Sequence, residues 1–92
     1  MTAVYNPTQY QLVALNAIIP PKRSVREIIS EEKLLELMAS IKENDLIQPI
    51  VLKLPVNGKY EIIVGERRYI AFQRLSLTEI PCVIRDVVER KA

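Results

Sequence analysis

One short segment of this chain holds the residue types that phosphate binding requires. Apolar residues 62–64 predict a strand, Gly65 permits a sharp turn, and residues 66–75 are mostly good helix formers. Free backbone N–H groups at the start of a helix attract anions, and arginine offers planar, paired donors to phosphate oxygens. Arg67 and Arg68 point about 100° apart on a helix, so a ligand that spans both fits them best. The segment therefore predicts an anion site suited to a polyphosphate.

A structural interpretation of the same charges stays open. Glu66 in the first turn of a helix suits the helix dipole. Solvation, or ion pairs with Glu61 or Glu79, would equally account for the two arginines. Charge at the start of a helix is therefore compatible with a binding site and with no site at all.

Two further segments hold polar residues in a less specific pattern. Gln48 both donates and accepts hydrogen bonds, which suits a base or ribose edge, and Pro49 stiffens the start of the next strand. Taken alone, such a segment is more typical of a loop. Residues 16–26 predict a connecting loop, and solvent exposure is favoured over phosphate contact for the bases in or beside it, which are Lys22, Arg23 and Arg26.

Composition narrows the range of functions. The 92 residues suffice for one domain, and the formal net charge of +2 gives no strong basic field of the kind that nucleic-acid binders carry. One cysteine, Cys82, and no histidine exclude an internal disulfide, a Cys/His metal site and a histidine-dependent triad. No apolar run could cross a membrane, and residues 1–7 lack the charged and apolar regions of a signal peptide, so we expect a cytoplasmic protein with no membrane partner. Cys82 is expected to be an inert buried thiol.

The periodicity of apolar residues predicts an α+β fold, with a small mixed sheet and helices packed on it. Strands are expected at residues 11–15, 50–54, 60–64 and 80–85. The Asn57-Gly58 pair predicts a hairpin between the two middle strands, and Pro81 is expected at the start of the last strand or on an edge. Helices are expected at residues 66–75 and from the cap Ser30 to near Asn44-Asp45. The second of these has an apolar stripe of Leu34, Leu37, Met38 and Ile41.

These elements divide the chain into three parts. Residues 1–10 lack periodicity and predict a flexible arm, and residues 11–86 form the domain. Residues 87–92 read as the start of a helix or a linker with no C-cap glycine, so we expect the chain to be cut from a longer protein.

Four segments in this order resemble the N-terminal domain of the ParB family of DNA-partition proteins. They are residues 34–43, 47–51, 65–71 and 77–81, and the resemblance spans about residues 12–86. It implies a ParB/sulfiredoxin-like fold that binds CTP with Mg²⁺, uses it as a switch to clamp a dimer around DNA, and hydrolyses it slowly in the full-length protein. The nucleotide-binding residues that it implies are Gly65, Glu66, Arg67, Arg68, Gln48, Pro49 and Arg26, with Glu66 as the residue that assists hydrolysis.

The chain departs from the family pattern at three places. Asp45 stands where the family usually has glycine, and Arg26 alone remains of an upstream Gln-Pro-Arg. The family's Glu-Asn-x-Gln-Arg motif and its helix-turn-helix would follow Ala92. We therefore expect weak nucleotide binding by this chain alone, DNA contact through the full-length protein, a homodimer, and a partition ATPase as partner.

Other functions on the same scaffold stay open. One is a ParB-like nuclease or small-molecule kinase, with Glu66 as a base or metal ligand and the arginines stabilising charge on phosphate. Another is a nucleotide-independent self-association module that uses a strand edge or the arm. A sulfiredoxin-like redox function is disfavoured, because that branch needs a reactive cysteine where this chain has Glu66.

Overall fold

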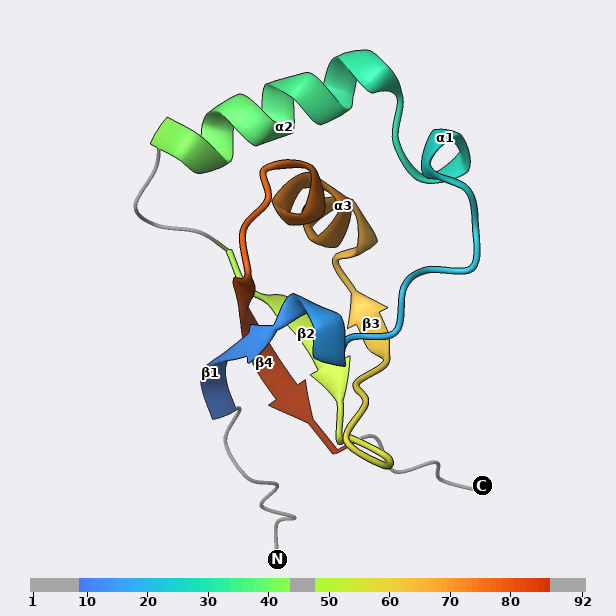
Figure 1. The fold of residues 1–92 in the computed structure, drawn as a ribbon, viewed down its shortest axis with the longest axis vertical. Helices are drawn as coiled ribbons and strands as arrows, with labels where there is room; N and C mark the ends of the chain where they lie inside the picture. The colour runs from blue at the N-terminus through green and yellow to red at the C-terminus, as the bar shows by residue number, and fades with distance from the viewer. Residues whose placement is uncertain (1–8, 44–47, 87–92) are drawn as a thin grey trace, which may run out of the picture.

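A mixed four-stranded sheet and a stack of helices make up the fold (Figure 1). The computed structural model describes residues 9–43 and 48–86. Its strands are β1 (Gln9–Ala14), β2 (Ile50–Lys53), β3 (Ile62–Val64) and β4 (Glu79–Arg85), and its helices are α1 (Val25–Ile28), α2 (Glu31–Glu43) and α3 (Glu66–Arg74), with a 3-10 turn, η1, at Leu15–Ala17. The predicted α+β class with a mixed sheet is confirmed.

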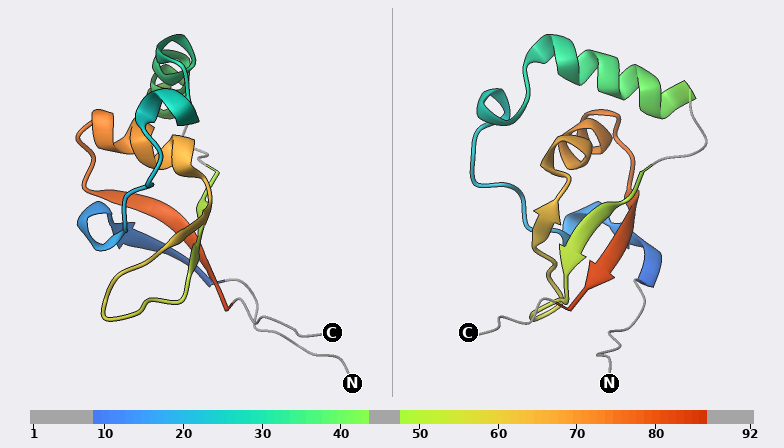
Figure 2. Two further views of the ribbon diagram at one scale, coloured as in Figure 1. Left: turned by 90° about the vertical axis from the view of Figure 1, so that its right-hand side faces the viewer. Right: turned by 180° about the vertical axis from the view of Figure 1, so that it is seen from behind.

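The strands lie in the order β1-β4-β2-β3. β4 runs antiparallel to β1 and parallel to β2, and β2 runs antiparallel to β3. Helix α3 contacts both central strands and α2 packs on α3, so α3 lies between α2 and the sheet (Figures 1 and 2). The layers are therefore the sheet, then α3, then α2.

The core forms where α3 meets the central strands. Ile50 pairs with Cys82 and Leu52 with Ile84 across the parallel ladder, and β-branched or apolar side chains fill this face. Four consecutive residues of α3, positions 69–72, are buried. On α2, Leu34 and Ile41 are buried, while Leu37 and Met38 are half-buried against the core, which confirms the predicted stripe.

The hairpin between β2 and β3 is confirmed. Asn57 and Gly58 have φ angles of 55° and 77°, and Val56 and Lys59 exchange backbone hydrogen bonds of 2.9 and 3.1 Å. Two central residues with positive φ are the signature of a type I′ turn, which matches the twist of the flanking strands. The turn fixes the direction in which β3 approaches the helices.

The structure corrects several predicted boundaries. β1 is Gln9–Ala14 rather than residues 11–15, so residues 9 and 10 belong to a strand and not to the arm. Residues 16–26 are not simply a loop, because they contain the end of η1 and the start of α1. Tyr60 bonds to the chain at Ala17 and Ile19 instead of extending β3, which is therefore shorter than predicted.

Pro81 occupies the third position of β4, which is a central strand and not an edge. It is tolerated there because pairing with β2 begins one residue later, at Cys82. The predicted end of α2 near Asn44, the family departure at Asp45, residues 1–8 of the arm and the tail 87–92 lie outside the described residues.

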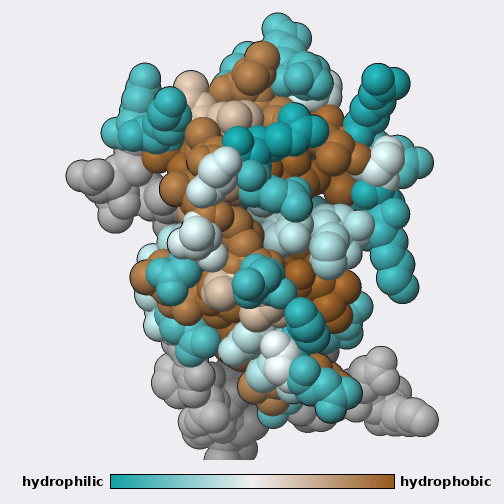
Figure 3. Space-filling view, viewed as in Figure 1, coloured by the Kyte–Doolittle hydropathy of each residue, from teal (hydrophilic) through white to brown (hydrophobic). Residues whose placement is uncertain are grey.

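Apolar surface remains between the hydrophilic side chains over both the helices and the sheet (Figure 3). No helix among the described residues is long and apolar enough to cross a membrane. Large apolar side chains are exposed on several elements, namely Tyr10, Leu12, Ile19, Leu35, Leu54, Val56, Ile63, Val64 and Leu77.

Cys82 has no exposed surface, and its Sγ lies 3.2 Å from the Ile80 carbonyl oxygen, to which the thiol donates. Burial raises the pKa of the thiol to about 12, although a backbone hydrogen bond with Val13 lowers it. The thiolate is the reactive form of cysteine, so the folded protein holds this residue in its unreactive form. The expected inert thiol is confirmed by its burial.

The raised pKa of Cys82 makes stability fall at alkaline pH. Above pH 9 the unfolded thiol loses its proton while the folded thiol keeps it, so the unfolded state binds fewer protons. We expect the free energy of unfolding, measured by urea denaturation, to fall by about 1 kcal/mol between pH 8 and pH 10. Cys82→Ala should remove this loss. Burial also raises the pKa of Tyr69, which contributes mainly above pH 10. An equal pH dependence in wild type and variant would contradict the assignment.

Candidate functional site

Gly65 forms the turn between β3 and α3 and is the N-cap of that helix. Its φ of 114° lies in a region that residues with a side chain rarely adopt. A Cβ on Gly65 would lie 2.5 Å from Cγ2 and 2.6 Å from Cβ of Ile50, which is buried in β2. Both the backbone conformation and the close contact with Ile50 therefore require glycine at this position. The first backbone N–H groups of α3 come directly after it in the sequence.

The two arginines that follow this turn lie in different environments. Arg67 is exposed, whereas Arg68 is half-buried and its Nη2 donates to Oε1 of Gln48 over 3.3 Å. This bond joins the start of α3 to the segment that leads into β2, twenty residues earlier in the chain. Two segments that the sequence singled out separately are thus adjacent in space. Of the two acids suggested as partners for the arginines, Glu61 pairs instead with Lys53, at 3.3 Å.

Glu66 forms an ion pair with Arg23, whose Nη2 lies 2.5 Å from Oε1 of the carboxylate. The side chains are 59% and 31% exposed respectively, so the pair lies at the surface. Arg23 directly precedes Ser24, which caps α1: the Ser24 hydroxyl accepts from the Glu27 N–H, and the Glu27 carboxylate accepts from the Ser24 N–H. Arg23 is exposed, as expected, and the capped turn also carries it to the start of α3, where it contacts Glu66.

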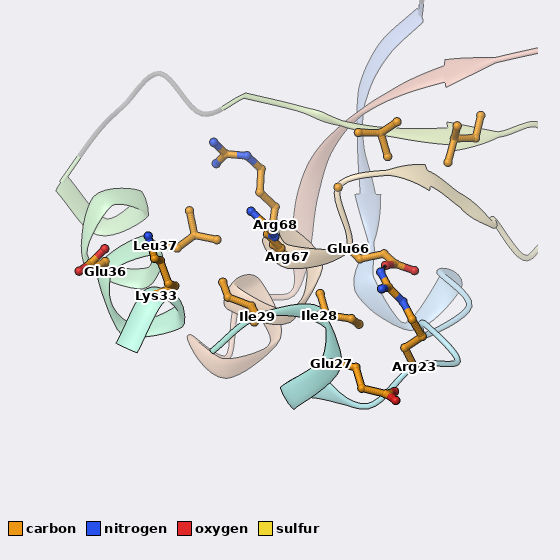
Figure 4. A pocket seen from close by; sticks show the side chains of 13 residues that line it. Arg23, Glu27, Ile28, Ile29, Lys33, Glu36, Leu37, Glu66, Arg67 and Arg68 are labelled. Carbon is orange, nitrogen blue, oxygen red and sulfur yellow. Dashed lines mark hydrogen bonds and ion pairs between the residues drawn. The ribbon is translucent and has the colours of Figure 1, made fainter. Parts of the chain in front are cut away.

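An open cavity of about 770 Å³ lies where α1, α2, β3 and α3 meet (Figure 4). Its volume lies in the range of small-molecule sites. Four cationic side chains and three carboxylates line it, together with apolar residues. The lining residues are Arg23, Glu27, Ile28, Ile29, Lys33, Glu36, Leu37, Ile63, Val64, Gly65, Glu66, Arg67 and Arg68.

The cavity brings together some of the predicted site residues and not others. All four residues of the Gly65 turn line it, and Gln48 reaches it through Arg68. Arg26 is exposed on α1, and neither it nor Pro49 is among the lining residues.

Sequence reasoning missed the contribution of α2 to this cavity. Lys33 and Glu36 lie one turn apart beside Leu37, which belongs to the apolar stripe. The sequence shows charged residues on both sides of that stripe. A helix face that is only solvated shows the same pattern, so the pattern did not indicate a cavity. The packing of α2 on α3 turns this face toward the arginines (Figure 4).

A family model of the ParB N-terminal domain matches residues 2–92 of this chain. A nucleoid occlusion protein of Geobacillus thermodenitrificans is 40% identical over 79 residues, which are 86% of this chain and 28% of that protein. A chromosome-partitioning protein Spo0J of Thermus thermophilus is 41% identical over 78 residues, 85% of this chain and 29% of that one. The chain thus spans less than a third of the length of these relatives.

Solved structures resemble the fold as well. The truncated chromosome-partitioning protein ParB of Caulobacter crescentus, complexed with CTP-gamma-S, superposes with a TM-score of 0.72 at 29% identity, over 88% of this chain and 46% of that chain. The same protein complexed to the centromeric parS site superposes with a TM-score of 0.64, over 86% of this chain and 40% of that one. Sulfiredoxin of Arabidopsis thaliana gives a TM-score of 0.69 at 33% identity, over 86% of both chains. The predicted ParB/sulfiredoxin-like fold is confirmed.

Replacing Gly65 by alanine should destabilise the domain by about 2 to 4 kcal/mol, because the new Cβ adds backbone strain and collides with Ile50. Gly58→Ala is the matched control: its φ is also positive, at 77°, but a Cβ there would meet nothing within 4 Å. We expect the free energy of unfolding of this control variant to fall by only about 1 kcal/mol. Urea denaturation of both variants measures the difference, and equal losses would show that the contact with Ile50 does not constrain the turn.

Proposed function

This chain belongs to the ParB N-terminal domain family, and from that premise we propose that it is the nucleotide-binding and partner-docking domain of a partition or nucleoid occlusion protein. The ligand is CTP, bound with its phosphates at the Gly65 turn. One observation carries this proposal: the turn and both arginines line one cavity, and Gln48, from a separate segment, accepts a hydrogen bond from Arg68 beside it.

The residues around this cavity fit a nucleoside triphosphate. The first N–H groups of α3 have no partner within the helix and can donate to phosphate oxygens, as can the Arg67 and Arg68 guanidinium groups. Gln48, held by Arg68, offers an amide to the base or ribose. Ile63 and Val64, which are exposed and line the cavity, supply apolar surface that an aromatic base would cover. A volume of about 770 Å³ accommodates such a ligand.

Two further roles rest on the family and on the acids at this site. Mg²⁺ would bind to the phosphate oxygens of the nucleotide and keep several of its waters, as this ion commonly does beside phosphates. Glu66 would assist a slow CTP hydrolysis in the full-length protein. The ParB protein of Caulobacter crescentus complexed with CTP-gamma-S supports the choice of nucleotide.

The nucleotide would act as a switch within a larger assembly. We propose that CTP closes a homodimer of the whole cytoplasmic protein around DNA, and that DNA is contacted by parts outside this domain. Support comes from the ParB protein complexed to the parS site, and from the fact that this chain spans 28% of the Geobacillus relative. A partition ATPase would dock on the same protein.

Calorimetric titration with CTP and Mg²⁺ tests the nucleotide site. We expect Arg67→Ala and Arg68→Ala each to weaken binding by about 10- to 100-fold, the loss of one hydrogen-bonded charge. Arg74→Ala is the matched control, because it removes the same charge from the exposed last turn of the same helix. Its affinity should match that of wild type.

Parallel titrations with ATP, GTP and UTP measure the selectivity for the base. Absence of binding by every nucleotide, both for this chain and for a version extended through the whole protein, would refute the proposal. Normal partition function of the double variant Arg67→Ala, Arg68→Ala would instead favour a nucleotide-independent module.

A further inference from the structure

We propose that Arg23 is a positioning residue: it neutralises Glu66 and holds its carboxylate aside, so that the Gly65 turn accepts a polyphosphate. This inference deepens the proposed function and rests on it. Arg23 is not among the residues that the family resemblance assigns to nucleotide binding, and its role follows from its contact with Glu66.

The position of Glu66 creates a problem that this contact solves. As the first residue of α3 it directly follows Gly65, so its carboxylate lies beside the N–H groups proposed to receive phosphate. An uncompensated carboxylate there would repel the ligand and would compete with it for the donors of the neighbouring arginines. The other acids of the cavity pose less of a problem. Glu27 is committed to the Ser24 cap, and Glu36 lies on the α2 side.

Arg23 meets this need in both charge and direction. Its guanidinium contacts the Glu66 carboxylate from the side of the loop before α1, whereas Arg67 and Arg68 extend toward the other side of the cavity (Figure 4). Glu66 therefore turns away from the two arginines, and their donors stay available to a ligand. The capping box formed by Ser24 and Glu27 fixes the turn that carries Arg23. The ion pair between Arg23 and Glu66 therefore starts from a defined backbone position.

The size of the effect follows from the exposure of the pair. Because the Arg23 side chain is 59% exposed, solvent and salt screen its charge. We therefore expect a loss of about tenfold in affinity on removing the charge, rather than abolition of binding. Raising the ionic strength should reduce the difference in affinity between wild type and the variant that lacks the Arg23 charge.

Arg23→Gln tests this inference, since it removes the charge but keeps a long polar side chain. Binding of CTP and of inorganic tripolyphosphate, measured by calorimetry, should weaken about tenfold, while a thermal melt confirms the fold. The double variant Arg23→Gln, Glu66→Gln should recover most of the lost affinity, because the repelling carboxylate is gone. Lys22→Gln is the matched control: it removes an adjacent, exposed base that does not line the cavity, and should bind as wild type does.

The outcomes separate this inference from the proposed function. If the single variant Arg23→Gln and the double variant Arg23→Gln, Glu66→Gln lose the same affinity relative to wild type, Arg23 contacts phosphate directly. The positioning role would then be overturned. Unchanged binding by Arg23→Gln would overturn it as well. Tripolyphosphate binding with the expected pattern, but no CTP binding, would support the role of Arg23 and refute CTP as the ligand. If neither this chain nor a version extended through the whole protein binds either ligand, both proposals fail.

Discussion

The contact between Gly65 and Ile50 is the constraint on which the geometry of this domain depends. Ile50 is buried in β2 and pairs with Cys82 of the neighbouring central strand, so its position is set by the core. Only a residue without a Cβ can pass this close to it and still turn into a helix. Packing therefore fixes the start of α3 relative to the sheet. The backbone N–H groups of its first turn are fixed in position for the same reason.

Several separate segments complete the site around this fixed point. The loop before α1 brings Arg23 to Glu66 across 43 residues of sequence, and the segment before β2 brings Gln48 to Arg68. Helix α2 lines one side of the open cavity because it packs on α3. The Glu66 charge is thus paired through a contact between elements, while the turn itself is held by the apolar core.

Local patterns predicted the parts of the fold that carry a strong signal of their own. The stripe of α2, the Asn57-Gly58 turn and the strand-glycine-helix order at Gly65 each arise from residues close together in sequence. Helix α1 was missed because four residues are too few to show a helical period, although the Ser24 and Glu27 capping box was present. The sequence predicts Tyr60 in the third strand. Its backbone instead forms a bridge with Ile18, which is distant in sequence.

By itself, the sequence determined the α+β class, the need for glycine at the turn and the presence of two arginines after it. Steric limits on backbone angles and helix periodicity act over a few residues, so they can be read along the chain. Tertiary structure alone decided that Arg23 pairs with Glu66, that Gln48 meets Arg68 and that Arg26 stays outside the cavity. Such pairings depend on how α1, α2 and the loops cross the sheet, and no local pattern specifies the path of a charged side chain between distant elements.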